Sequence, residues 1–262
     1  MQEWFTPGFS SIDGVMVVHN IRMVLEYDGS NYHGWQRQKN ALAVQQVVEE
    51  TLEKLYKRKI RVIAAGRTDR GVHAKGQSIN FKVQDNPIPV NRLPLAVNSL
   101  LPSDIAAVHA EEKPLDFHAR YDVKSKVYSY KILNRKYPSP LLRNYSWHVN
   151  QPLDIEKIKA AMKYFLGEHD FASFQASGNC VKNTVRTIQD LYLEKHGDIL
   201  IFRIKGNGFL YNMVRIIIGT LVEIGLEKMP PHSIPRIIQA KDRNLAGPTA
   251  PPKGLCLEHV EY

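Results

Sequence analysis

The chain has 262 residues and is 44% hydrophobic, which is enough to bury one large core or two of ordinary size and excludes an intrinsically disordered protein. Its 35 lysines and arginines outnumber its 26 aspartates and glutamates, and the resulting net charge of +9 favours a polyanionic partner such as nucleic acid. Charge alone leaves open a basic protein that binds no polyanion. The apolar run at positions 15–18 is too short for a signal peptide or a membrane span.

The ends of the chain and its cysteines give two further expectations. Residues 1–20 contain no lysine or arginine, and we expect a loosely ordered extension that precedes the true start at Met16 or Met23. The two cysteines, Cys180 and Cys256, lie far apart and neither belongs to a Cys-x-x-Cys pair. Zinc binding and redox chemistry are therefore disfavoured, and a reducing, cytoplasmic location is expected.

The first half of the chain reads as alternating strands and helices. Alternation of apolar and polar residues predicts a strand at 21–27, and a helical period predicts a helix at 44–55. Between them, the loop at 32–39 mixes aromatic, amide and basic side chains, which suits contact with nucleotides, although its Gly-Trp pair is equally typical of a packing anchor. The remaining elements predicted here are strands at 60–64, 76–83 and 105–110, and a helix at 90–101.

A turn at 65–74 presents a carboxylate at the end of a predicted strand. Glycines bracket Arg67, Thr68 and Asp69, and Arg70 follows directly. Because Asp69 lies among arginines, we expect a positive local field that favours its ionised form, as a nucleophile or a ligand requires. The alternative is a turn whose aspartate only accepts hydrogen bonds from nearby backbone.

The second half follows a linker at 111–114 and repeats the order of elements loosely. In the strand predicted at 123–133, alternation places Lys124, Lys126 and Tyr128 on one face with Tyr130. Such a face can stack a base and hold a phosphate, although tyrosine is favoured in any strand. The other predicted elements are helices at 155–166, 210–226 and 233–240, and strands at 187–194, 199–205 and 255–262.

This order of elements predicts an α/β (α+β) fold made of two similar sandwich domains of the RRM or ferredoxin-like kind. Antiparallel sheets with helices on one face bury such a pattern most economically. We expect the domains to span 21–113 and 114–262, with residues 1–20 outside them. The catalytic candidate Asp69 then belongs to the first domain.

Arg215 is out of place in its predicted helix. The helix is apolar around most of its circumference, and no acidic residue occupies the neighbouring positions 211, 212, 218 and 219. A buried, unpaired guanidinium costs several kcal/mol, so its partner must come from elsewhere in the fold or from a ligand. We nominate Asp69. The alternative is that Arg215 lies on a narrow exposed stripe and extends its charged end into water.

Taken together, these segments resemble the bacterial tRNA pseudouridine synthase A family, from about residue 21 onward. The resemblance rests on Tyr27-Asp28-Gly29, Gly34-Trp35-Gln36, Ala65-Gly66-Arg67-Thr68-Asp69, Gly71-Val72-His73-Ala74, Gly76-Gln77, Tyr128-Ser129-Tyr130, Met213-Val214-Arg215 and Ala250-Pro251-Pro252-Lys253-Gly254-Leu255.

The resemblance implies a role for each residue of the proposed site. Asp69 would be the catalytic aspartate, Arg67 would displace and replace the target base, and Tyr128 would pack against the flipped uracil. Arg215 would pair with Asp69, in agreement with the charge argument. The family's fold consists of two α/β domains with joined, mainly antiparallel sheets and the active site in a central cleft.

The resemblance also implies a substrate and a mode of action. The family isomerises uridines 38, 39 and 40 of the tRNA anticodon arm, works as a homodimer, and needs neither metal nor organic cofactor. Neither a membrane nor DNA is expected as a partner. The carboxylate would attack C6 of the base, attack C1′ of the ribose or remove a ribose proton, and the sequence does not choose among these, since each needs the same ionised aspartate.

The resemblance is incomplete at a few positions outside the assigned chemistry. These positions, which depart from the commonest family pattern, are Ala43, Arg70, Lys126 and Asn212. We expect Arg70 and Lys126, together with the loop residues Arg37 and Lys39, to contact the RNA and make binding sensitive to salt.

Two functions compete with pseudouridine formation. A non-catalytic RNA-binding or chaperone protein with RRM-like domains explains the charge and the fold, but not an aspartate on a glycine-flanked turn with an arginine in an apolar helix. A metal-dependent nuclease requires clustered carboxylates and histidines, and His73 with Asp69 is too small a set.

Overall fold

The computed structural model describes residues 17–178 and 183–262. Cys180 and most of the expected extension therefore lie outside the described residues. The helices are α1 (Val44–Tyr56), α2 (Leu93–Asn98), α3 (Ile155–Met162), α4 (Met213–Gly225) and α5 (Ser233–Ala240). The strands are β1 (Val18–Tyr27), β2 (Ile63–Ala64), β3 (His73–Gln84), β4 (Ile105–Lys113), β5 (Ser125–Asn134), β6 (Trp147–Val149), β7 (Gly167–Asp170), β8 (Val185–His196), β9 (Ile199–Gly206) and β10 (Leu255–Glu261).

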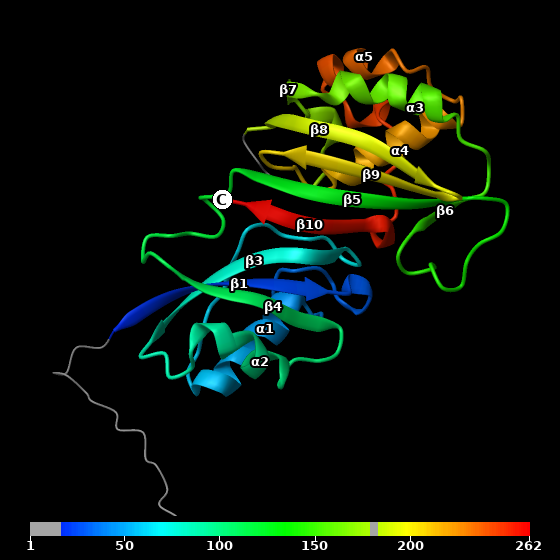
Figure 1. Ribbon diagram of the computed structural model, residues 1–262. Helices are drawn as coiled ribbons and strands as arrows, with labels where there is room; N and C mark the ends of the chain where they lie inside the picture. The colour runs from blue at the N-terminus through cyan, green and yellow to red at the C-terminus, as the bar shows by residue number, and fades with distance from the viewer. Residues whose placement is uncertain (1–16, 179–182) are drawn as a thin grey trace, which may run out of the picture.

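The described strands form one mixed, mostly antiparallel sheet, which confirms the expected fold class. Its main order is β4-β1-β3-β10-β5-β9-β8-β7, while β2 pairs with β3 and β6 pairs with β5 (Figure 1). Helices α1 and α2 lie beside β1, β3 and β4, and the other three lie beside β5, β8 and β9 (Figure 1). The division into domains at 113 and 114 stays a prediction.

The last strand joins the two halves of the sheet. β10 pairs in parallel with β3 over two residues, opposite His73 and Ala74, and antiparallel with β5, where Leu257 lies opposite Tyr128. Gly76 permits this close approach, because a Cβ atom there would lie 2.4 Å from the Glu258 carbonyl oxygen. The strand thereby places the turn before β3 next to the tyrosine face of β5.

Several predicted boundaries were wrong, each because of a contact between distant segments. Val18–Asn20, expected in the extension, belong to β1 and pair with β3, and Asn20 also pairs with β4. The strand expected at 60–64 is reduced to β2, because the Val62 N–H donates to the Glu49 carboxylate (3.2 Å) instead of a neighbouring strand. The helix expected from 210 begins at Met213, because Asn212 has the left-handed φ of 60°.

Helix α1 begins without a side-chain cap. Ala43 occupies the N-cap position and has no hydroxyl or carboxylate to offer the first N–H groups of the helix. Loop carbonyls accept these bonds instead, from Val44 N to Gly34 O (3.2 Å) and from Gln45 N to Trp35 O (2.9 Å). The missing side-chain cap at Ala43 is therefore compensated by the backbone of the loop at 34–35.

Helix α4 is buried on nearly all sides, as its composition predicts. Eleven of its thirteen residues are buried, and Gly219 lies against the segment at 247–250. The Thr220 hydroxyl accepts a hydrogen bond from Gly247 N (2.9 Å), and Ala250 N donates to Arg215 O (3.1 Å). Within residues 17–178 and 183–262, no helix combines the length and the apolar character that crossing a bilayer demands.

We expect Gly219→Ala to destabilise the fold, because the new Cβ atom would lie 1.7 Å from the Pro248 carbonyl oxygen. Overpacking of this kind costs about 1–3 kcal/mol, which urea unfolding measures directly. Glu223→Ala in the same helix is the matched control and loses only a partly exposed ion pair with Lys228, worth less than about 1 kcal/mol. Unchanged stability in Gly219→Ala would show that the segment at 247–250 moves away freely.

Candidate active site

The turn that carries Asp69 is held by backbone hydrogen bonds on both sides. Trp35 N donates to Thr68 O (3.0 Å), and Val72 N donates to Asp69 O (3.1 Å). Gly34 has a φ of +86°, and a Cβ atom there would lie 2.6 Å from the Thr68 carbonyl oxygen, so glycine is required for both conformation and space. The Thr68 hydroxyl lies 2.8 Å from the Tyr27 hydroxyl beneath the turn. The turn therefore holds the Asp69 carboxylate in a fixed position.

Arg215 forms the predicted ion pair with Asp69. Its Nη1 lies 3.3 Å from Asp69 Oδ2, and the two side chains are only 14% and 22% exposed. The guanidinium also donates from Nε to Ala250 O (2.7 Å) and from Nη1 to Asn212 Oδ1 (2.7 Å). These bonds fix the guanidinium in front of the carboxylate, so the alternative of an exposed Arg215 is wrong.

The pKa of Asp69 runs against the expectation from its sequence neighbours. Burial raises the pKa of the Asp69 carboxyl above its ordinary value, and the Arg215 guanidinium offsets only part of this rise. Arg67 and Arg70 contribute no resolved effect, because both side chains extend into solvent. The expected dominance of a positive local field was wrong, since desolvation of the carboxylate outweighs the attraction of the one cation, Arg215, that lowers its pKa.

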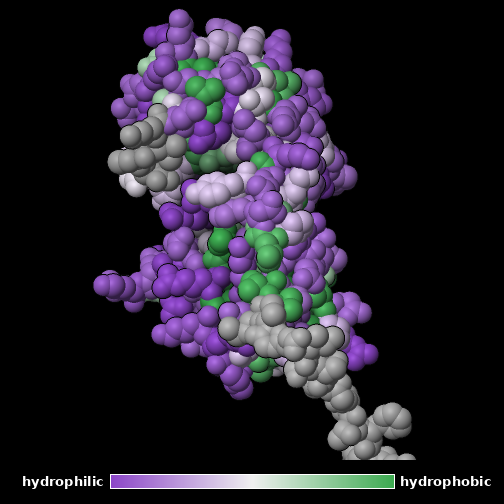
Figure 2. Space-filling model, turned by 90° about the vertical axis from the view of Figure 1, so that its left-hand side faces the viewer, coloured by the Kyte–Doolittle hydropathy of each residue, from purple (hydrophilic) through white to green (hydrophobic). Residues whose placement is uncertain are grey.

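Asp69 lies in a cleft of about 1470 Å³ lined by segments from both halves of the chain. Asp69 is the one acidic residue among the described residues that line it, and the lining cations are Arg67, Arg70, Arg120, Lys126, Arg186 and Arg215. The face drawn in Figure 2 is hollowed between its upper and lower parts, and hydrophilic side chains dominate the surface around the hollow. The cleft therefore favours a polyanion that brings an uncharged group to the carboxylate.

Tyr128 lies in the same cleft as Asp69 and is almost wholly buried. Its ring meets the edge of Phe209, with centroids 5.3 Å apart and planes at 88°. Burial raises the pKa of the Tyr128 phenol, and the nearby Asp69 carboxylate raises it further. The phenol thus stays protonated at neutral pH and remains a hydrogen-bond donor.

A family model described as tRNA pseudouridine synthase matches residues 23–122 and 161–262 of this chain. The chain belongs to this family. The tRNA pseudouridine synthase A of Thermoanaerobacter sp. (strain X514) is 49% identical over 245 residues, which cover 94% of this chain and all of that protein. The tRNA pseudouridine synthase A of Moorella thermoacetica is 50% identical over 244 residues, covering 92% of this chain and 99% of that protein.

The similarity of this chain to solved structures is much weaker than its similarity to the sequence relatives. The archaeal box H/ACA sRNP Nop10-Cbf5 complex matches with a TM-score of 0.32 and 14% identity, over 78% of this chain and 42% of the other. That likeness supports no conclusion about the site. Membership of the tRNA pseudouridine synthase family rests on the family model and the sequence relatives.

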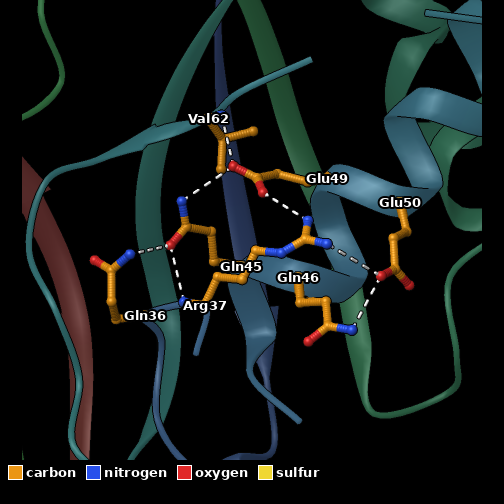
Figure 3. Close-up of polar contacts among 7 residues, drawn as sticks. All are labelled: Gln36, Arg37, Gln45, Gln46, Glu49, Glu50 and Val62. Atoms are coloured by element: carbon orange, nitrogen blue, oxygen red, sulfur yellow. Dashed lines mark hydrogen bonds and ion pairs between the residues drawn. The ribbon is translucent and has the colours of Figure 1, made fainter. Parts of the chain in front are cut away.

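The predicted RNA-contact residues of this family member lie in two places. Arg70 and Lys126 line the cleft with Arg67, and neither Arg67 nor Arg70 forms an ion pair or hydrogen bond with another described side chain. Lys39 lies on the surface outside the lining. Arg37 is also outside it, and its guanidinium is bound to Glu49 (3.2 Å) and Glu50 (3.7 Å) (Figure 3). Their contacts with RNA stay predictions.

Lys126 is held deep in the wall of the cleft. Its ammonium donates to the Ala65 carbonyl oxygen (2.7 Å) at the start of the turn that carries Asp69. Burial, together with the charges of Arg120 and Arg186, lowers the pKa of Lys126 to about 8. Sequence reasoning missed Arg120 and Arg186, because an arginine in a loop or at a strand end carries no pattern that distinguishes a cleft from open surface.

His73, which the nuclease alternative places beside Asp69, faces a different cavity. Its ring nitrogens bond to Gly29 N (3.1 Å) and to Asn144 O (2.9 Å), and it lines a separate pocket with Asp28 and Tyr145. Within the part of the chain that the structure describes, no group of three or more His, Cys, Asp or Glu residues is placed to hold a metal ion.

We expect Arg215→Leu to lower stability most at neutral pH. Without the guanidinium the raised pKa of Asp69 rises further, and a raised carboxyl pKa costs stability as pH increases through it, because ionisation then opposes folding. The deficit should reach at most about 3 kcal/mol at pH 7 and shrink towards pH 4. Urea unfolding across this pH range measures it.

Two comparisons test the cause of that deficit. Arg215→Leu combined with Asp69→Asn should recover stability at pH 7, because no carboxylate then has to ionise without a cation. The exposed Arg67→Leu should change stability by less than about 0.5 kcal/mol. A deficit in Arg215→Leu that is independent of pH would contradict the electrostatic origin.

Proposed function

We propose that this chain is an isomerase that converts uridine to pseudouridine in tRNA, with Asp69 as its catalytic group. The observation that carries the proposal is a rigidly held carboxylate, paired with a mostly buried guanidinium, in a cleft whose other charged residues, among those described, are all cations. Membership of the tRNA pseudouridine synthase family supports the reaction, and the two relatives described above bear the name tRNA pseudouridine synthase A. The cations supply the sites for an RNA backbone.

The finer assignments are part of the same proposal. Uridines 38, 39 and 40 of the anticodon arm are the proposed targets, supported by the resemblance to the synthase A family. A homodimer in the cytoplasm, acting without metal or organic cofactor and with neither DNA nor membrane as partner, completes it. The 49–50% identity to synthase A relatives over nearly their full length supports carrying these properties over.

The reaction breaks the glycosidic N–C bond, turns the detached uracil and rejoins it through carbon, with no net redox change or hydrolysis. The target nucleotide must first leave its stack, which costs a few kcal/mol. Arg67 is exposed on the cleft, and its side chain forms no ion pair or hydrogen bond with residues 17–178 and 183–262, so it can occupy the vacated space. Tyr128 offers a fixed aromatic surface for the flipped base.

Asp69 must be ionised in each of the three pathways that the sequence leaves open. Burial opposes that ionisation, and Arg215 restores part of it while holding the carboxylate in place. A desolvated carboxylate is a stronger nucleophile and base than one in water, so partial burial favours the chemistry. Tyr128, protonated at neutral pH, can also assist proton transfer at C5 through its hydroxyl.

A non-catalytic RNA-binding protein would gain nothing from this arrangement. A carboxylate inside a cationic cleft repels the RNA backbone, and burying it with its guanidinium costs several kcal/mol of desolvation. Catalysis gives the buried pair a function that binding alone does not require.

Asp69→Asn should bind tRNA but release no tritium from C5-labelled uridine, because the amide is neither a base nor a nucleophile. We expect a loss of at least about 1000-fold in kcat, with tRNA affinity equal to or above that of the unchanged protein. Asp116→Asn, in an exposed loop, is the matched control and should keep full activity. Substantial turnover by Asp69→Asn would contradict the assignment of Asp69 as the catalytic group.

The activity should fall as pH decreases through a pKa above the ordinary aspartate value. Because the pKa of Asp69 is raised, its reactive, ionised form is lost at a higher pH than in an exposed aspartate. Arg215→Gln should shift this limb of the kcat/KM profile to higher pH, since the cation that favours ionisation is gone. A limb at the same pH in both proteins would contradict the role given to Arg215.

A further inference from the structure

The loop at 34–37 lies directly on the catalytic turn and carries a glutamine into the cleft. Trp35 is bonded through its backbone to Thr68, one residue before Asp69, and Gln36 and Gln45 both line the cleft. None of the functions derived so far uses either amide. Their chemistry differs from that of the surrounding arginines, since an amide presents a donor and an acceptor without charge.

A chain of hydrogen bonds anchors Gln36 to a buried carboxylate (Figure 3). Glu49 of α1 is buried and accepts from Arg37 Nη1 (3.2 Å), Val62 N (3.2 Å) and Gln45 Nε2 (3.0 Å). Gln45 Oε1 in turn accepts from Gln36 Nε2 (2.7 Å). The chain thus runs from the interior, through Gln45, to the side chain at the cleft.

This chain fixes which way each amide points. The Glu49 carboxylate accepts hydrogen bonds from Arg37 and Val62 N and is the acceptor for Gln45 as well, so Gln45 turns its NH₂ group towards it and its oxygen outwards. Arg37 N, which can only donate, bonds to the same Gln45 oxygen (3.0 Å) and enforces that orientation independently. Gln36 must then use its NH₂ group on Gln45, and Figure 3 shows the Gln36 amide oxygen turned away from the network.

We propose that Gln36 reads the RNA through this oxygen, which accepts a hydrogen bond from a ribose 2′-hydroxyl or a base N–H of a nucleotide in the cleft. The inference rests on the proposed function and adds a residue that discriminates among nucleotides. A phosphate oxygen only accepts, so it cannot bond to a fixed acceptor and is turned towards the arginines instead. Gln36 therefore favours the position of the RNA that places a hydrogen-bond donor against its amide oxygen. The cations, in contrast, hold the RNA backbone in any position along the cleft.

The hydrogen bond to Gln45 also holds the exposed Gln36 side chain in the orientation that the proposed contact requires. Fixing a glutamine costs side-chain entropy, and a fixed side chain binds with less further loss than a mobile one. Gln45 acts through Gln36 and is a positioning residue. Arg37 serves the same network through its backbone N–H and its ion pair with Glu49.

The test removes the acceptor and the donor separately, on a synthetic anticodon arm. Gln36→Met keeps the length of the side chain and removes the amide. Gln46→Met removes a neighbouring side-chain amide of α1 that, among the described residues, bonds only to Glu50 and lies outside the cleft lining. Each nucleotide of the arm is replaced in turn by its 2′-deoxy form or by a base analogue without the N–H. The kcat/KM for pseudouridine formation is measured for every pair of protein and RNA.

We expect Gln36→Met to lower kcat/KM on the unmodified arm by about threefold to tenfold, the range for a lost neutral hydrogen bond, and Gln46→Met to leave it unchanged. One RNA substitution should cause a similar loss with the unchanged protein and no further loss with Gln36→Met. A 2′-deoxy substitution in that place assigns the donor to the ribose, and a base analogue assigns it to the base.

Other outcomes overturn the inference. Full activity of Gln36→Met on the unmodified arm does so, as does an RNA series in which every substitution has the same effect in both proteins. Thermal unfolding verifies that Gln36→Met is folded, and Gln36→Ala repeats the test if it is not. The unchanged protein is assayed first, since its failure to form pseudouridine would refute the proposed function itself, whereas normal turnover with an unaffected Gln36→Met refutes only the role of Gln36.

Discussion

The ion pair between Asp69 and Arg215 is the constraint on which the rest of the site depends. It joins residues 146 positions apart, from a turn in one half of the sheet and a buried helix in the other. Burying two charges is costly, and here the cost is offset by their attraction and by the bonds of Arg215 to Ala250 and Asn212. The pair holds only while every segment that carries these groups stays in place.

Backbone contacts, more than side chains, keep those segments in place. The loop at 34–35 serves both as the cap of α1 and as the support of the turn that carries Asp69, and β10 brings β3 and β5 together. Glycine is required where chains meet this closely, as at Gly34 beneath the turn and Gly219 beneath the segment at 247–250. Because glycine has no side chain, the backbone segments can approach closely at these two positions. This close approach holds the charged groups of the ion pair in place.

The cations and the acid that line the cleft have different proposed tasks, binding for the cations and chemistry for the acid. Under the proposed function, the cations hold a polyanion wherever a phosphate falls, and Asp69, the one acid among the described lining residues, acts only on a group brought to it. The proposed contact of the anchored Gln36 amide adds uncharged recognition, which electrostatics lacks. The proposal thus assigns affinity, selection and catalysis to different side chains of one cleft.

The sequence by itself determined the type and order of most elements, because hydrophobic period and turn residues are local properties. It also predicted the pairing of Arg215 with Asp69, since an apolar helix without an acidic neighbour leaves a cation to be satisfied elsewhere. Tertiary structure decided the late start of β2, the inclusion of Val18–Asn20 in β1, and the direction of the Asp69 pKa shift. Each of these depends on burial or on a partner distant in sequence, which no local pattern records.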